Sequence, residues 1–131
     1  MAEFEPIPSD TEAVGAAIVN AAMNVHMHLG PGLLESVYES CLCHELRKRK
    51  IEFLRQLDLP ILYDDIRLES GLRIDVLAAE HVIIEVKSVE TILPVHEAQL
   101  LTYLKLTKKR LGLLLNFNVP LMKHGIKRKV L

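Results

Sequence analysis

The sequence predicts a single α/β domain in which two helices precede a mixed β-sheet and a third helix interrupts the strands. Three observations support this fold class. The chain has 131 residues, of which 50% are hydrophobic and 25% charged, the composition of one globular domain. Apolar residues recur at helical spacing near the N-terminus and with period two after residue 52. Glycine and proline separate many of these periodic segments.

Two helices are expected before residue 51. Ser9 and Glu12 have the spacing of a capping box, and apolar residues then repeat every three or four positions, which predicts a helix over residues 9–28. The Gly-Pro-Gly sequence at 30–32 ends it. A second apolar stripe at helical spacing predicts a helix over residues 33–50.

The rest of the chain is predicted to alternate between strands and one helix. The expected strands are residues 53–63, 66–68 with 72–79, 82–87, 111–117 and 126–130. The segment 82–87 is almost entirely apolar, which is typical of a central strand covered on both faces. Pro94 opens a helix that runs to about Leu106. The predicted order is therefore ααβββαββ.

The domain is expected to cover residues 10–131, with residues 1–9 as a short flexible arm. This arm has two acids and two prolines and lacks the pattern of a secretory signal. The apolar runs are too short to span a membrane. Cys41 and Cys43 are two positions apart on a helix and cannot bridge each other, so we expect reduced thiols in a cytoplasmic protein.

The net charge of −1 conceals a strong asymmetry along the chain. The segment 98–131 has eight basic residues and no acidic one, whereas residues 1–97 have a net charge of −9. This distribution favours a polyanionic partner, although lysines that only solubilise the surface would give the same pattern. The residues expected to contact phosphates are Lys108, Lys109, Arg110, Lys127, Arg128 and Lys129, with Lys123 nearby.

Charged residues interrupt two strands that are otherwise apolar. Strict alternation places Ile74 and Val76 on one face of their strand and Asp75 on the other. In the next strand, Glu85 and Lys87 share a face. A short turn between the two strands makes a hairpin, so these charges are expected to lie side by side. Such charges are costly unless they pair or bind a metal.

Two neighbouring carboxylates suit Mg²⁺ or Mn²⁺, which bind through one or two carboxylates and retain water. Lys87 could then stabilise the charge of a scissile phosphate, or position or deprotonate the attacking water. A buried ion pair of Lys87 with Asp75 or Glu85, without catalysis, is the alternative that spacing alone leaves open. The cysteine and histidine spacings do not fit a structural zinc site.

Two helices offer further candidate residues. On the second helix, Glu35 is in line with two core leucines, which predicts a carboxylate at the border of the apolar stripe, whereas Glu39 is expected to be more exposed to solvent. Gln99 and Tyr103 lie four positions apart on the third helix and could contact a phosphate or a backbone oxygen. A surface ion pair for Glu35 and ordinary packing for the other two are the alternatives.

Several motifs together resemble one known family. They are GLLESVY at 32–38, RID at 73–75, EVK at 85–87, HEAQLLTYLK at 96–105 and GLLLNF at 112–117. In this order they are similar to the GxxExxY proteins, a small bacterial and archaeal family of the PD-(D/E)xK nuclease superfamily. The likeness covers nearly the whole chain from about Val14 onward. It implies a restriction-endonuclease-like αβββαβ core, preceded here by an extra N-terminal helix.

The same resemblance implies roles for individual residues. Asp75 and Glu85 would bind the metal, Lys87 would be the catalytic lysine and Glu35 would complete the site. Gln99 and Tyr103 look like the Q-x-x-x-Y element of RecB-type members of the superfamily. Ile74 stands where the superfamily often has proline, a position that varies widely.

The function expected from these observations is a metal-dependent nuclease that acts on DNA or RNA. Because a domain of this size leaves little room for a nucleic-acid groove, a homodimer with two sites is also expected. A nucleic-acid-binding or assembly module that keeps the fold without cutting is the main alternative. A metal-dependent hydrolase of small phosphoesters is a weaker one.

Overall fold

The computed structural model describes residues 5–131, except for the side chain of Ser70. The elements are α1 (Ser9–Leu29), α2 (Glu35–Lys48), β1 (Phe53–Tyr63), β2 (Ile66–Ala78), β3 (Val82–Lys87), α3 (Pro94–Thr107), β4 (Leu111–Asn116), the 3₁₀ turn η1 (Met122–His124) and β5 (Ile126–Val130). This order confirms the predicted one. The two segments expected at 66–68 and 72–79 form a single long strand.

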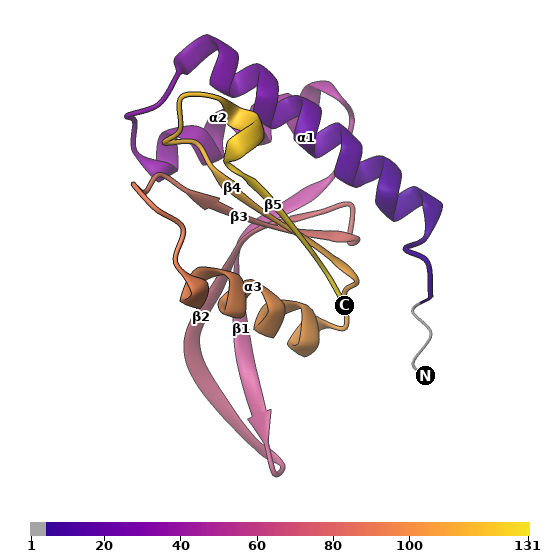
Figure 1. Cartoon of the computed structure of the whole chain (residues 1–131). Coiled ribbons are helices and arrows are strands. Elements are labelled where there is room, and N and C mark those ends of the chain that lie inside the picture. The colour runs from indigo at the N-terminus through magenta and orange to yellow at the C-terminus, as the bar shows by residue number, and fades with distance from the viewer. Residues whose placement is uncertain (1–4) are drawn as a thin grey trace.

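The five strands form one mixed sheet in the order β1-β2-β3-β4-β5. Strands β3 and β4 are parallel, and the other neighbours are antiparallel. Helices α1 and α2 cover one face of the sheet, and α3 covers the other (Figure 1). The prediction of a central mixed sheet flanked by helices is therefore confirmed. No helix within residues 5–131 is both long and apolar enough to cross a membrane.

Two apolar clusters hold the layers together. The larger one lies between the sheet and α1 with α2, and the smaller one lies between the sheet and α3. Strand β3 contributes Val82, Ile84 and Val86 to the larger cluster and Ile83 to the smaller one, as expected for a central strand covered on both faces. On β4, a Cβ atom at Gly112 would lie 2.8 Å from Cδ1 of Leu100, so glycine lets α3 pack closely against the strand.

The predicted capping box at the start of α1 is wrong. Ser9 is the first residue of the helix and Pro8 is its N-cap, without a side-chain capping bond. The backbone N–H of Glu12 donates to the carbonyl of Pro8 at 3.0 Å. Because Ser9 already lies inside the helix, its hydroxyl is one position too late to act as the cap.

The loop that joins α1 to α2 is held by Tyr38, which is fully buried. Its hydroxyl donates to the carbonyl of Gly30 at 2.6 Å and accepts the N–H of Leu33 at 3.1 Å. Its ring stacks on Phe117 with the two centroids 4.6 Å apart. The loop turns through positive φ angles at Gly30 and Gly32, which glycine adopts without strain. Tyr38 thus fixes where α2 begins relative to the sheet.

Candidate functional site

The candidate site lies where β2 and β3 separate. The two strands pair from Ala78 with Val82 to Val76 with Ile84, and the ladder ends there. Just beyond it, Oδ2 of Asp75 accepts the N–H of Val86 at 2.8 Å, and Oε2 of Glu85 accepts the N–H of Asp75 at 2.9 Å. Each carboxylate therefore takes a backbone donor at the point of separation. We call Asp75, Glu85 and the following Lys87 the carboxylate fork.

Burial makes the charges of the fork costly. Glu85 is 3% exposed, and its pKa is raised to about 8. Burial is the larger cause, and the nearby carboxylate of Asp75 is the second. Burial is also the main cause that raises the pKa of Asp75. Lys87 lowers the pKa of both groups, although less strongly than burial raises it. Because two carboxylates lie beside one lysine, Glu85 retains a proton near neutral pH.

The alternation of side chains changes at the fork. Ile74 packs in the cluster under α3, whereas Val76 packs in the cluster under α1 and α2. The expectation that these two residues share a face is therefore wrong. Opposite Asp75, Gln56 on β1 has a φ of 51°, a left-handed conformation that breaks the period of two. Asp75 therefore lies where the side chains of β2 change from one face of the sheet to the other.

Glu39 on α2 is the residue that sequence reasoning missed. It is 6% exposed, so the expectation that it is more solvated than Glu35 is wrong. Its Oε2 accepts Nε of Arg55 at 3.0 Å and Nη2 at 2.8 Å. Its Oε1 accepts Nε2 of Gln56 at 2.7 Å, and the same amide lies 3.4 Å from Oδ1 of Asp75. The polar pair Arg55-Gln56, within a largely apolar strand, is the signal that could have identified it.

Glu35 lies beside the fork rather than inside it. It is the first residue of α2, it is exposed, and its Oε1 accepts the N–H of Ser88 at 3.4 Å. The hydroxyl of Ser88 donates to the carbonyl of Leu33 at 2.6 Å. The buried Asn116 binds both backbone groups of Val89, at 3.1 Å and 3.0 Å. These contacts hold the segment that follows Lys87, and neither Ser88 nor Asn116 belongs to a pattern in the sequence that predicts this role.

Tyr103 approaches the fork from α3. It is buried, and its pKa is raised by burial and then by the carboxylates of Glu85 and Asp75, while a hydrogen bond with the backbone of Arg73 lowers it. Gln99 is half-buried one turn earlier on the same helix. The structure thus brings Tyr103 close to the carboxylates of the fork.

The basic residues 108–110 lie far from the fork. They precede Leu111, which pairs with Val82, whereas Lys87 at the other end of β3 pairs with Asn116. Five residues of strand separate these ends by about 17 Å. Arg110 also donates to the carbonyl oxygens of Leu131 and Glu5, at the end of the sheet away from the fork. The expectation that these three residues act together with the fork is not supported by their position.

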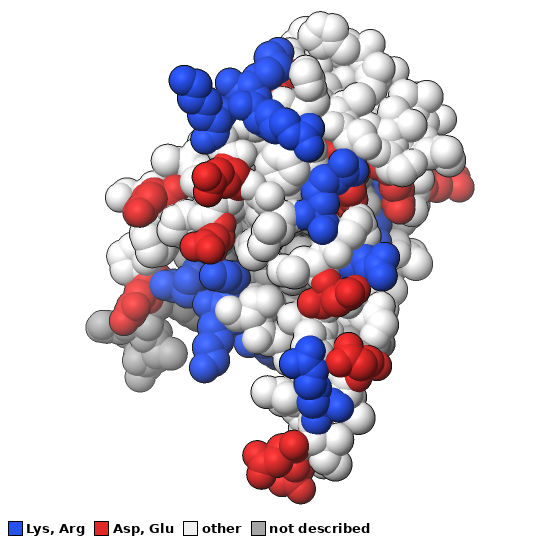
Figure 2. Space-filling view, turned by 180° about the vertical axis from the view of Figure 1, so that it is seen from behind, with Lys and Arg blue, Asp and Glu red and all other residues white. Residues whose placement is uncertain are grey.

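Strand β5 divides the other predicted phosphate contacts between two faces. Lys129 pairs with Glu97 of α3 at 2.6 Å, whereas Arg128 pairs with Glu12 of α1. Only Lys127 is level with the fork, because it pairs with Leu114, which in turn pairs with Glu85. Figure 2 shows that Lys and Arg side chains form separate groups with Asp and Glu between them. The basic segment of the sequence is not one basic patch.

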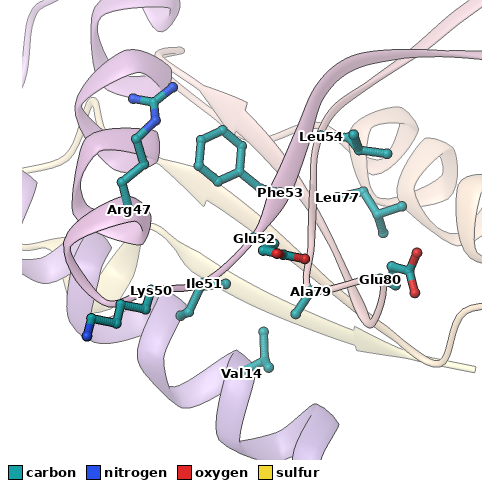
Figure 3. Close-up of a pocket in the computed structure, with 10 residues that line it drawn as sticks. All are labelled: Val14, Arg47, Lys50, Ile51, Glu52, Phe53, Leu54, Leu77, Ala79 and Glu80. Atoms are coloured by element: carbon teal, nitrogen blue, oxygen red, sulfur yellow. The ribbon is translucent and has the colours of Figure 1, made fainter.

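A hollow of about 1200 Å³ lies away from the fork, between the end of α2, α1 and the start of β1 (Figure 3). Its lining includes Val14, Lys50 and Phe53, and the guanidinium of Arg47 lies 5.0 Å from the centre of the Phe53 ring. None of the fork residues lines it. The concave surface and the candidate chemistry are therefore separate.

The donor set of the fork suits a cation held by few protein ligands. Over residues 5–131, no group of three or more His, Cys, Asp or Glu side chains is arranged to hold a metal. Two carboxylates remain, the buried Glu85 and the half-buried Asp75, and they are close enough for Asp75 to raise the pKa of Glu85. Mg²⁺ is commonly bound by one or two carboxylates together with water and substrate phosphate. The residues present fit such an ion.

Comparisons with known proteins identify the family. The family model described as the PD-(D/E)XK nuclease superfamily matches residues 12–129, which is most of the chain. Searches of curated proteins and of solved structures found no match. The match agrees with the restriction-endonuclease-like arrangement of the sheet and helices and supports a function of the nuclease type. The chain belongs to the PD-(D/E)XK nuclease superfamily.

Proposed function

We propose that this protein hydrolyses phosphodiester bonds of DNA or RNA with a divalent cation. The observation that carries the proposal is the carboxylate fork. The buried Glu85 and the half-buried Asp75 meet where two strands separate, each carboxylate is oriented by a backbone N–H, and a lysine follows two residues after Glu85. A structural ion pair does not require two carboxylates for one lysine. A site that binds a cation in addition to the lysine does require the second carboxylate.

Asp75 and Glu85 are the residues that would hold Mg²⁺ or Mn²⁺, with Glu35 contributing directly or through water. When bound, the cation would neutralise the two carboxylates and stabilise negative charge on a phosphate. The backbone donors occupy Oδ2 of Asp75 and Oε2 of Glu85. They thereby fix the orientation of the other oxygen of each carboxylate. The protein's contribution is thus a rigid pair of ligands, set by the strands themselves.

Lys87 is proposed to bind a phosphate oxygen and to orient the attacking water. Its place at the end of β3 puts its ammonium within electrostatic reach of both carboxylates. Tyr103 and Gln99 are proposed to position the nucleic-acid strand from the α3 side. Glu39 is proposed as a positioning residue, because it holds Gln56 against Asp75.

Nucleic acid is the proposed substrate because the family is a nuclease family. Lys127 is the predicted phosphate contact that lies level with the fork. The free thiols Cys41 and Cys43 agree with a reducing, cytoplasmic location, which we also propose. A homodimer would supply a longer substrate-binding surface than one chain of this size.

The proposal is tested by incubating the purified protein with labelled single-stranded and duplex DNA and RNA, in Mg²⁺, in Mn²⁺ and in chelator. The Lys87→Ala variant is compared with Lys48→Ala, which removes an exposed lysine at the far end of α2. Metal-dependent cutting that is lost only in Lys87→Ala would support the nuclease. Cutting that is equally strong in both variants would remove Lys87 from the mechanism.

The second candidate function is a nucleic-acid-binding or assembly module that does not cut. The specific observation in its favour is that the described residues offer two carboxylates rather than a group of three or more metal ligands. Salt-sensitive binding to nucleic acid without cleavage in any metal would favour this function. In that case the fork would be a metal or structural site only.

A further inference from the structure

The hairpin formed by β1 and β2 extends well beyond the rest of the sheet (Figure 1). Strand β2 pairs with β3 only over residues 76–78, so the remainder of the hairpin is a two-stranded ribbon. Near the body, α3 covers this ribbon through Leu57, Leu72 and Ile74. Residues 61–68, which we call the hairpin tip, have no such cover. A two-stranded ribbon is marginally stable in water unless something packs against it.

One face of the hairpin tip is entirely apolar. The cross-strand pairs are Ile61 with Leu68 and Tyr63 with Ile66, and residues at these alternate positions share a face. Tyr63 is 70% exposed, Ile66 56% and Leu68 47%. With the half-buried Ile61, these three exposed side chains form a continuous apolar strip.

The opposite face of the tip is different. It carries Leu62, which is 72% exposed, and Arg67, which forms an ion pair with Glu69 at 3.2 Å. The tip is therefore amphipathic, with its polar groups on one side and an apolar strip on the other. The strip, rather than the whole tip, is the surface that lacks a partner.

The charges next to the strip indicate which kind of partner can cover it. The turn at the end of the hairpin is Asp64-Asp65, and both residues are exposed. Among the ion pairs of residues 5–131, none involves these two aspartates. Their charges repel a phosphate backbone, which disfavours nucleic acid as the occupant. Acidic side chains are visible at the far end of the hairpin in Figure 2.

The chain itself offers the complementary charges. Lys105 and Lys108 are exposed at the end of α3, and the ion pairs found in the described chain leave both out. Helix α3 packs against the base of the same hairpin. A second copy related by a two-fold axis would bring strip against strip. Each acidic turn would then approach the lysines of the other copy.

We propose that the apolar strip of the hairpin tip, Ile61, Tyr63, Ile66 and Leu68, is the contact surface for a second copy of this chain. The two hairpins pack face to face. The interface consists of an apolar centre flanked by ion pairs between Asp64 or Asp65 and the lysines at the end of α3 of the other copy. It does not depend on the proposed nuclease activity, because no residue of the fork takes part.

The test is sedimentation velocity of the full chain over a range of concentrations. The wild type is expected to form a dimer, and the Tyr63→Ser/Ile66→Ser variant is expected to dimerise at least about tenfold more weakly. Leu62→Ser is the matched control, since it removes an equally exposed apolar residue from the opposite face. It should dimerise like the wild type. Far-UV circular dichroism checks that each variant is folded.

A charge exchange between the turn and α3 distinguishes a lost contact from a folding defect. Asp64→Lys/Asp65→Lys should weaken the dimer, and adding Lys105→Glu/Lys108→Glu to the same chain should restore it. A wild type that is monomeric at every concentration would overturn the proposal. A dimer that loses affinity in Leu62→Ser but not in Tyr63→Ser/Ile66→Ser would overturn it as well.

Discussion

The carboxylate fork and the basic C-terminal segment place their charges in opposite ways. In the fork, Asp75 and Glu85 are ten residues apart in sequence, and strand geometry brings them together, with each carboxylate accepting a backbone N–H of the other strand. In the segment 98–131, eight basic residues are close in sequence but scattered in space. Arg128 and Lys129 even pair with helices on opposite faces of the sheet.

This difference shows that clustering along the chain is a poor guide to clustering in space. Successive side chains of a strand point to opposite faces, so consecutive basic residues of β5 are distributed over both faces of the sheet. Two strands that separate can concentrate charges from distant positions. We therefore expect substitutions in the fork to have much larger effects than substitutions in the basic segment.

The largest effect is expected from Asp75→Asn. This change removes one charge of the fork while keeping its shape, and metal-dependent cleavage should fall by about 10²–10³-fold. Asp58→Asn is the matched control, because Asp58 is on the same hairpin in an exposed ion pair with Arg73. It should cut like the wild type. Equal losses in the two variants would mean that the fork has no special role.

Glu85→Gln should change how stability depends on pH. The folded pKa of Glu85 is raised from 4.5 to about 8, so the folded state binds more protons than the unfolded state between these values. The free energy of unfolding of the metal-free protein should therefore fall as pH rises through this window, by at most about 1.4 kcal/mol per pH unit. Urea unfolding at pH 6 and pH 8.5 measures it. The variant should lose most of this dependence, and an unchanged slope would contradict the cause assigned to the shift.

Glu39→Gln is expected to have an intermediate effect. It weakens the contacts with Arg55 and removes the charge that orders Gln56 beside Asp75. The free energy of unfolding should fall by about 1–3 kcal/mol, and cleavage should fall by about tenfold with a higher metal requirement. A loss of stability at unchanged metal requirement would show that Glu39 acts only in folding.

The smallest effect is expected from Lys127→Ala. If this lysine contacts one phosphate, binding to duplex DNA should weaken severalfold, and the slope of log affinity against log salt should change by about 0.9. Arg128→Ala is the comparison, since Arg128 is paired on the other face. It should leave the salt slope unchanged. Equal changes in both variants would indicate a diffuse electrostatic contribution.

The sequence predicts the order of elements well because period and turn residues report local geometry. The helices and strands agree with those expected to within a few residues, and the buried strand at 82–87 is central. The sequence also predicts that Asp75 and Glu85 are neighbours, because charges stand out in apolar strands, and the hydrogen bonds of the fork confirm this. These features depend on the neighbours of each residue along the chain.

The features that the sequence does not predict depend on contacts between distant segments. Glu39 is buried because Arg55 and Gln56 of β1 reach it, and no helical wheel of α2 contains that information. The change of face between Ile74 and Val76 follows from the left-handed Gln56 on the neighbouring strand. A pattern of period two cannot show it. The distance of Lys108 from the fork likewise follows from the parallel register of β3 and β4.

The proposed nuclease mechanism requires that Asp75 and Glu85 form one divalent-cation site. It is tested most directly by titrating Mn²⁺ into the purified protein and into Asp75→Asn, with binding followed by electron paramagnetic resonance. We expect a saturable site in the wild type that is lost in Asp75→Asn and retained in Asp58→Asn. Equal binding of Mn²⁺ by the wild type and Asp75→Asn would contradict it.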